Sequence, residues 1–300
     1  MIRVLLAALL CVAAEAADID KLWDFDLPAE SEQRFRTALV AAQREADVAL
    51  QAELVTQIAR ARGLQGDMAA ANAALDSLVP RLAELPPAVS VRYMLERGRL
   101  YQLATDIPKA KRWLRNALSH AQRHQLDYLA IDALQMLGYL ETAKNAVGLQ
   151  MQALNLALAS QDPRAQNWLG VLYQNLGWTY RNQRDYPKAL DFFRQAQAWH
   201  EQRGGGKPWL IARWSVAKVL RESGEPDKAL LIQLDVERGW QKLGQTDGHV
   251  LEEIGENLLT LGRRAEARPY FVRALDVLSR DPWFARNEPA RHARLAKLAQ

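Results

Sequence analysis

The 300-residue sequence predicts an all-α fold, a solenoid of about six stacked helix pairs, because small residues recur in two series that stay in phase. The first series recurs every 38 to 40 residues and consists of Ala59, Gly98, Gly138, Gly177, Ala217 and Gly255. The second series follows it by 12 residues and consists of Ala71, Ala110, Gln150, Ala189, Ala229 and Ala267. Repetition with a period of about 20–50 residues is typical of units that bury their apolar faces only by stacking. The constant offset predicts two packed helices in each unit.

The N-terminal residues have the pattern of a secretory signal. Arg3 precedes an apolar run from Val4 to Ala14, and Ala14 and Ala16 offer the small side chains that a signal peptidase accepts. We therefore expect residues 1–16 to be a signal peptide cleaved between Ala16 and Ala17. The mature protein would then be periplasmic or secreted, with no transmembrane segment. The alternative is an apolar N-terminal helix of a cytoplasmic protein.

The chain has a single cysteine, Cys11, which lies inside this apolar run. The mature chain would therefore contain no thiol and no disulfide. Lipidation of Cys11 is the less favoured alternative, because Leu10 stands where a lipidated cysteine normally follows a small residue. An extended segment, residues 17–30, is expected to lead into the repeats.

The repeat solenoid is expected to cover residues 31–279, with an entry helix over 31–46 and paired helices from 48 onward. In the fourth unit, four residues at i, i+3, i+4 and i+7 share one face of the first helix: Tyr173, Leu176, Gly177 and Tyr180. Asp185 and Pro187 then predict the cap and first turn of the second helix. A small residue at the crossing lets the two backbones approach closely.

Two regions depart from the regular pattern. In the third unit Gln150 replaces the expected small residue, so we expect this repeat to be the least regular. Residues 280–300 are expected to form a C-terminal capping helix, because Asp281 and Pro282 break the last repeat helix. Basic residues would give this cap the polar outer face that a solenoid end requires; they are Arg286, Arg291, Arg294 and Lys297.

The fourth unit resembles the tetratricopeptide repeat. Its motif residues in this chain are Tyr173, Leu176, Gly177, Tyr180, Ala189, Phe193 and Ala196. The resemblance implies a right-handed superhelix of about six repeats and is closest to stand-alone bacterial proteins to which no activity is attached. The usual period is about 34 residues, so the extra residues here would lengthen the helices and inter-repeat turns. HEAT-like pairs match the longer period but not the 12-residue offset, and remain the alternative fold.

Charge and motifs argue against several functions. The net charge of +4 arises from 39 basic and 35 acidic residues, a mild excess that does not predict nucleic-acid binding. The glycines at 204–206 before Lys207 lack the Ser or Thr and the earlier Gly of a phosphate-binding loop. His120 and His124 share a helix face without a third recognisable ligand, and Glu252 and Glu256 are interpreted as exposed charge. We expect no catalytic residues, no metal, no cofactor and no enzymatic activity.

The tetratricopeptide resemblance implies that certain first-helix positions line a concave groove. The candidate groove residues are Arg60, Arg92, Arg99, Gln135, Tyr139, Gln174, Trp178, Arg181, Asn182, Trp214, Lys218 and Arg221, with His249, Glu252 and Glu256 at the equivalent positions of the sixth unit. Arginine can hold a carboxylate through two hydrogen bonds, and tryptophan can bury an apolar anchor. The alternative is that the tryptophans fill gaps between repeats and the arginines pair with neighbouring Glu. Lys and Asn do not recur as in the carboxylate clamp of chaperone-binding relatives, so that ligand is not implied.

These observations predict a non-enzymatic scaffold of the cell envelope that binds an extended protein or peptide segment. We expect this segment to be acidic. The alternative is a cytoplasmic regulatory or nucleic-acid-associated helical module. The oligomeric state stays open.

Overall fold

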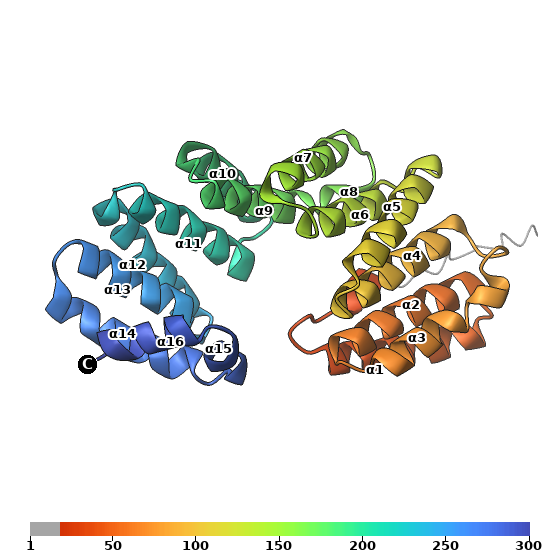
Figure 1. Cartoon of the computed structure of the whole chain (residues 1–300), viewed down its shortest axis with the longest axis horizontal. Helices are drawn as coiled ribbons and strands as arrows, with labels where there is room; N and C mark the ends of the chain where they lie inside the picture. The colour runs from red at the N-terminus through yellow and green to blue at the C-terminus, as the bar shows by residue number, and fades with distance from the viewer. Residues whose placement is uncertain (1–18) are drawn as a thin grey trace, which may run out of the picture. The chain divides into compact units, whose positions relative to one another are not determined.

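The computed structural model describes residues 19–300, except for the side chains of residues 143 and 144. The predicted signal peptide, its cleavage site and Cys11 lie outside the described residues. Every regular element within the described range is an α-helix or a 3₁₀-helix, and the elements follow one another as helix pairs (Figure 1). The prediction of an all-α helical-repeat solenoid is confirmed. No helix in this range is long and apolar enough to cross a bilayer.

The chain divides into two compact units, residues 1–136 and 137–300. In the first unit the helix α2 packs against α1 and α3, and α4 packs against α2 and α5. Its elements are η1 (Ile19–Leu22), α1 (Pro28–Arg44), α2 (Val48–Leu64), α3 (Met68–Asp76), η2 (Val79–Arg81), α4 (Pro87–Leu103), α5 (Ile107–Arg123) and most of α6 (Asp127–Tyr139). In the described part of the expected extended segment, η1 forms a short 3₁₀-helix and α1 begins at Pro28. Trp23 packs edge-on against buried Phe35 and holds this part of the chain against α1.

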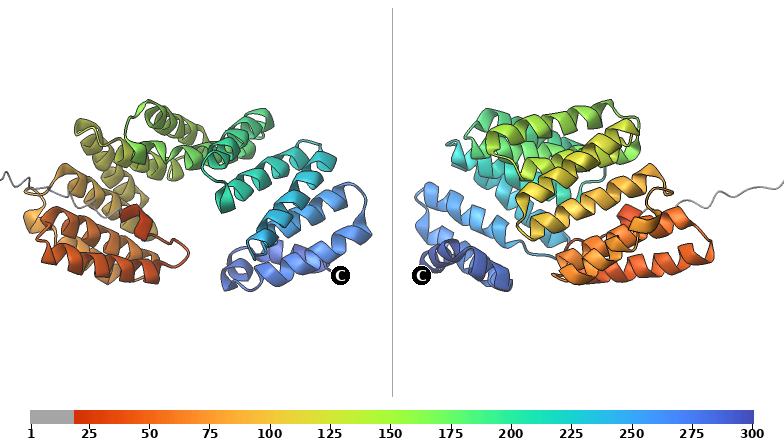
Figure 2. Two further views of the ribbon diagram at one scale, coloured as in Figure 1. Left: turned by 180° about the vertical axis from the view of Figure 1, so that it is seen from behind. Right: turned by 45° about the vertical axis from the view of Figure 1, so that its right-hand side comes forward.

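The second unit contains three closely packed pairs, α9 with α10, α11 with α12 and α13 with α14 (Figure 2). Its elements are α7 (Ala143–Ala159), α8 (Pro163–Gln166), α9 (Leu169–Asn182), α10 (Tyr186–Glu201), α11 (Gly206–Glu222), α12 (Pro226–Lys242), α13 (Gly248–Thr260), α14 (Arg264–Leu278), α15 (Pro282–Asn287) and α16 (Pro289–Leu298). Two short helices replace the single expected cap, because Pro289 pushes Glu288 out of helical geometry, to φ −123° and ψ 50°.

One turn geometry links the first helix of a pair to the second. The residue before the capping position has a positive φ, as at Gly66, Thr105 and Arg184. The next residue, Asp in each of these three turns, accepts a hydrogen bond from the backbone N–H three positions later, as Asp106 does from Lys109 and Asp185 from Lys188. The three pairs that share this turn have the same 12-residue offset, and the third pair keeps that offset although Thr142 precedes α7 without a side-chain cap hydrogen bond.

The small residues of the first series lie where the two helices of a pair touch. A Cβ atom added at Gly98 would lie 2.7 Å from Leu114, and one at Gly177 would lie 2.5 Å from Phe193. At Gly138 the nearest such atom, the Cγ of Gln150, is 3.7 Å away. The third pair therefore packs more loosely at this point, and the boundary between the two units falls inside its first helix.

Candidate functional site

The first helices of successive pairs, α2, α4, α6, α9, α11 and α13, carry the predicted groove residues. These positions recur at i, i+3, i+7 and i+10 of each helix and so fall on one side of it. We call this side the first-helix face and describe it separately in each unit.

In the first unit, ion pairs join neighbouring first helices across this face. Arg92 on α4 lies 3.1 Å from the carboxylate of Glu53 on α2. Arg99 on α4 donates to both carboxylate oxygens of Asp132 on α6, at 2.5 and 2.6 Å, and to Glu96 at 2.6 Å. The predicted groove residues Arg92 and Arg99 therefore hold acids of the protein itself.

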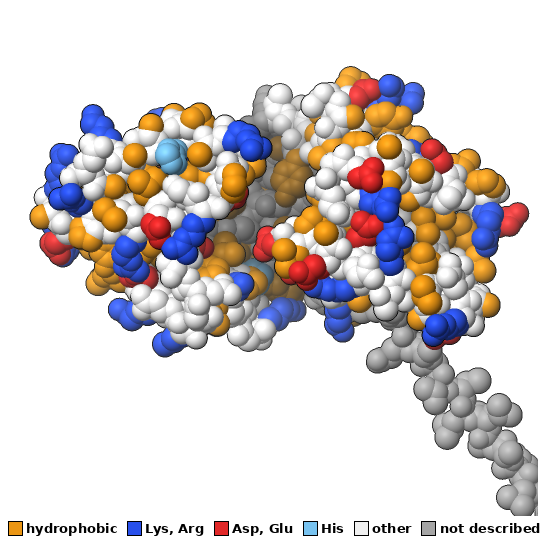
Figure 3. Space-filling view, turned by 90° about the horizontal axis from the view of Figure 1, so that it is seen from below, with side chains coloured by type: hydrophobic (Ala, Val, Ile, Leu, Met, Phe, Trp, Pro, Cys, Tyr) orange, Lys and Arg blue, Asp and Glu red, His pale blue; other side chains and the backbone are white. Residues whose placement is uncertain are grey.

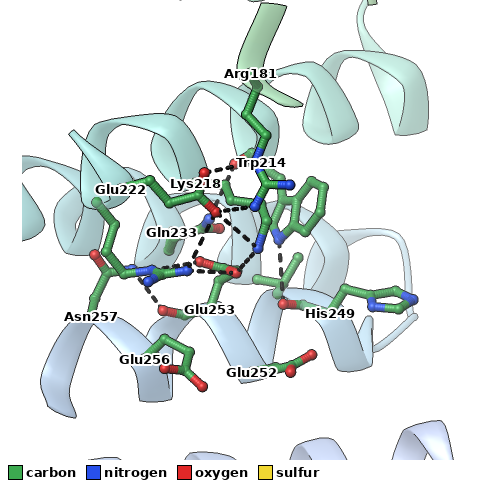
Figure 4. Close-up of polar contacts among 12 residues, drawn as sticks. Arg181, Trp214, Lys218, Glu222, Gln233, His249, Glu252, Glu253, Glu256 and Asn257 are labelled. Carbon is green, nitrogen blue, oxygen red and sulfur yellow. Dashed lines mark hydrogen bonds and ion pairs between the residues drawn. The ribbon is translucent and has the colours of Figure 1, made fainter. Parts of the chain in front are cut away.

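The second unit repeats this relationship (Figure 4). Arg181 on α9 donates through Nε to Glu222 on α11 at 2.7 Å. Arg221 on α11 donates to both oxygens of Glu253 on α13, at 2.9 and 3.1 Å, and Lys218 donates to the same carboxylate. The Glu253 side chain is only 4% exposed, so its two basic partners compensate an almost fully buried charge.

The last helix extends the series of ion pairs. Arg291 on α16 donates through Nε to both oxygens of Glu252 on α13 at 3.0 Å, and Arg294 donates to Glu256 at 2.9 Å. The interpretation of Glu252 and Glu256 as exposed charge is therefore wrong. Arg291 is half-buried against Glu252, whereas Arg294 is exposed, as expected for the cap, and also pairs with Glu256. The helix α16 packs against α14 and is joined to α13 by these ion pairs.

Trp178 and Trp214 bridge repeats and remain half-buried. Their ring centroids are 5.7 Å apart, and Trp178 also packs edge-on against Phe193 at 5.0 Å. Trp214 donates through its indole nitrogen to the carbonyl of His249 at 3.3 Å. Both rings are therefore partly packed against the protein and partly exposed on the first-helix face. Gln174 supports them through a 2.7 Å hydrogen bond to Ser215.

The remaining predicted residues lie in varied surroundings. Tyr139 is 57% exposed and its hydroxyl accepts a hydrogen bond from Asn175 at 2.9 Å. Asn182 is exposed and accepts from Arg181 at 3.2 Å. Gln135 is only 2% exposed, so it is a buried side chain rather than an open surface group. Arg60 is half-buried and lies over aromatic rings.

Sequence reasoning missed two apolar residues on this face, Val171 and Ile211. They are 45% and 43% exposed, and each precedes a predicted groove residue, Gln174 or Trp214, by three positions. The repeat itself could have revealed them, because they are 40 residues apart and occupy the same place in adjacent first helices.

Burial and paired charge set the electrostatics of the face in the first unit. Burial alone would lower the pKa of Arg99, but Asp132 and Glu96 raise it above its ordinary value. Burial works against ionisation of Asp132, yet Arg99 and Arg60 lower the pKa of that carboxyl. Burial raises the pKa of Glu96 despite the nearby Arg99. Arg99 and Asp132 therefore stay charged and locked together at neutral pH.

The face shown in Figure 3 has mixed charge, and the other candidate groups of the sequence lie as follows. Lys and Arg side chains are interspersed with Asp, Glu and apolar side chains on the viewed face (Figure 3). The rings of His120 and His124 are 4.7 Å apart. Within the described part of the chain, no group of three or more His, Cys, Asp and Glu could hold a metal ion. The glycines at 204–206 adopt positive φ values and lead directly into α11.

The fold and this face define a helical-repeat protein whose first helices are joined by ion pairs. A model of the tetratricopeptide repeat matches residues 171–198, which cover most of α9 and α10. The match and the repeated helix pairs show that the fold is similar to that of tetratricopeptide repeat proteins, and the likeness assigns no activity. A search of the curated proteins found no match.

Several solved structures are similar in fold. A signal transduction ATPase with a tetratricopeptide repeat sensor from Pyrococcus horikoshii has a TM-score of 0.68 and 12% identity, over 86% of this chain and 39% of that one. This chain thus spans well under half the length of that relative. NprR in complex with its cognate peptide NprX has a TM-score of 0.56 and 15% identity, over 93% and 81%. A Rap protein complexed with Competence and Sporulation Factor has a TM-score of 0.50 and 16% identity, over 92% and 89%.

Proposed function

We propose that the protein is a non-enzymatic scaffold that binds an extended peptide or protein segment on the first-helix face of its second unit. The observation that carries this proposal is the exposure of Val171 and Ile211, one repeat apart, beside the half-buried rings of Trp178 and Trp214. Exposed apolar residues at equivalent positions offer a row of contacts for the apolar side chains of an extended segment. The similar fold of NprR, solved with its cognate peptide, supports this function.

The ion pairs change the role expected of the arginines. Arg181 and Arg221 already hold carboxylates of the neighbouring helix, so binding a partner's carboxylate would first require breaking a pair. Their role in this proposal is to hold adjacent first helices in register. A rigid face loses little conformational freedom when a segment binds to it.

A paired substitution tests the proposal. A random peptide library would be selected on the full-length protein, and the enriched peptides would be titrated against Val171→Glu with Ile211→Glu. We expect at least about a tenfold loss of affinity, since about 1.4 kcal/mol of apolar contact corresponds to tenfold. The matched control is Leu231→Glu with Val272→Glu, two exposed apolar residues on the second helices α12 and α14. No enriched peptide, or equal losses in the two variants, would contradict the proposal.

We also propose that the protein acts in the cell envelope, on the basis of Arg3, the apolar run and the alanines before Ala17. Determining the N-terminal residue of the mature protein tests this location. Ala17 at the terminus would support export, and Met1 would contradict it. The nucleic-acid alternative has less support, because the basic residues that face Glu222 and Glu253 are neutralised within the protein.

A further inference from the structure

Arg60 differs from the other basic residues of the first-helix face. Arg92, Arg99, Arg181, Lys218 and Arg221 each pair with an acidic side chain. Among the described residues, Arg60 has no Asp or Glu within ion-pair distance. Its guanidinium carbon instead lies 5.1 Å from the ring centroid of Trp23 and 5.0 Å from that of Phe25.

The two aromatic rings next to Arg60 are held in place by stacking and by a buried hydrogen bond. Trp23 and Phe25 stack with centroids 4.8 Å apart and ring planes inclined by 6°. The indole nitrogen of Trp23 donates to Gln57 at 2.9 Å, and Gln57 is buried on α2, one turn before Arg60. The Gln57 amide in turn donates to Thr56 at 3.0 Å. A buried hydrogen-bonded side chain therefore fixes the ring that carries the guanidinium.

The charges around Arg60 leave it without an acid of its own. Burial lowers the pKa of Arg60, and Arg99 lowers it further. Glu96 and Asp132 raise the pKa of Arg60 and so offset part of this effect. Both acids, however, are hydrogen-bonded to Arg99. An arriving carboxylate would give the half-buried Arg60 an acidic partner in direct contact, which a guanidinium can bind through two parallel hydrogen bonds.

We propose that Arg60, on its support of Trp23 and Phe25, is a binding site for a carboxylate that lies next to an apolar or aromatic group of a ligand. Phe25 is 58% exposed and supplies the apolar contact beside the cation. The carboxylate is either the C-terminus of a peptide or an Asp or Glu side chain within it. The inference deepens the proposed peptide-binding function but uses the first unit, so the two are tested separately.

Two small acidic probes and their neutral counterparts test the site on the full-length protein. N-acetyl-phenylalanine offers a terminal carboxylate, and its amide is the control. The capped dipeptide acetyl-Asp-Phe-amide offers a side-chain carboxylate, and acetyl-Asn-Phe-amide is the control. The readout is the NMR signal of the Trp23 indole N–H, assigned with Trp23→Phe. We expect a saturable shift with at least one acidic probe and none with the neutral ones, and the responding probe identifies the source of the carboxylate.

Substitutions of Arg60 and Phe25 complete the test. Arg60→Gln should weaken binding of the acidic probe at least about tenfold, and Arg60→Lys should weaken it less. Phe25→Ala, at an exposed position that the fold tolerates, should weaken it by a smaller factor. Arg112→Gln, an exposed cation on α5, should leave it unchanged. The site is ruled out if neither acidic probe produces a saturable shift, or if Arg60→Gln and Phe25→Ala both bind as the unsubstituted protein does. Peptide binding by the second unit would stand in either case.

Discussion

Arg181 on α9 holds the carboxylate of Glu222 on α11, 41 residues further along the chain (Figure 4). The same relationship joins Glu53 to Arg92 and Glu252 to Arg291, each 39 residues apart in sequence. Within each unit, neighbouring first helices are thus connected by charges as well as by apolar packing. This arrangement leads to several predictions.

Removing the shared acid of the second unit should be costly. Glu253→Ala leaves Lys218 and Arg221 without their carboxylate, in a site where Glu253 is nearly fully buried. Loss of one member of a buried ion pair costs about 3–5 kcal/mol, and because the two bases are partly exposed we expect a smaller loss of about 2–3 kcal/mol. Urea unfolding followed by tryptophan fluorescence measures it. Asp276→Ala, at an exposed pair on α14, should cost under about 0.5 kcal/mol. Equal losses would contradict a structural role for Glu253.

The same substitution at two equivalent glycines should have opposite effects. Gly177→Ala places a methyl group 2.5 Å from the ring of Phe193, and overpacking of this kind costs about 1–3 kcal/mol. Gly138→Ala meets nothing closer than 3.7 Å and should stabilise by up to about 1 kcal/mol through helix propensity. Thermal unfolding of both variants provides the comparison. A destabilised Gly138→Ala would show that the third pair is as tightly packed as the fourth.

The turn before α5 should be improved by glycine. Thr105 has a φ of 60°, a left-handed conformation that is unfavourable for a β-branched residue. The equivalent residue before α3, Gly66, has a φ of 84° without that penalty. We expect Thr105→Gly to raise the free energy of unfolding by about 1 kcal/mol and Gly66→Thr to lower it by about 1 kcal/mol or more. Chemical denaturation of the two variants would measure both changes, and a loss of stability in Thr105→Gly would argue against strain at this turn.

Stability should fall in mild acid because of His200. Burial lowers the pKa of His200, as does Arg203, and its ring packs against Gly170 at the start of α9. The folded state therefore binds fewer protons than the unfolded state below the ordinary histidine pKa of about 6.5, so the free energy of unfolding decreases as the pH falls through that range.

Replacing this histidine isolates its contribution. We expect His200→Gln to reduce the slope of unfolding free energy against pH between about 6.5 and 5, the range in which an unperturbed histidine would take up its proton. Some slope should remain, because burial also lowers the pKa of His120. An unchanged slope in the variant would show that folding does not lower the pKa of His200.

Much of the fold was predictable because its signals are local. The phase of Gly177 and Ala189 sets where a helix pair crosses, and Asp185 caps the second helix of its pair as expected. The C-terminal cap was less predictable, because the basic pattern of residues 286–297 does not reveal that Pro289 divides it into two helices. Nor does that pattern reveal that Arg291 and Arg294 turn toward α13.

The sequence by itself determined the class of fold, the repeat register and the side of each first helix on which Trp178, Trp214 and the arginines lie, because helical periodicity places residues on faces without reference to distant parts of the chain. Only the tertiary structure decided which of those cations are already paired. Each pair joins residues 32 to 41 positions apart, and whether a guanidinium reaches Glu222, Glu253 or no acid at all depends on how adjacent helices are rotated and shifted. Packing between repeats sets those small displacements. It therefore decides that Arg181 and Arg221 pair with acids of neighbouring helices, whereas Arg60 lies beside aromatic rings.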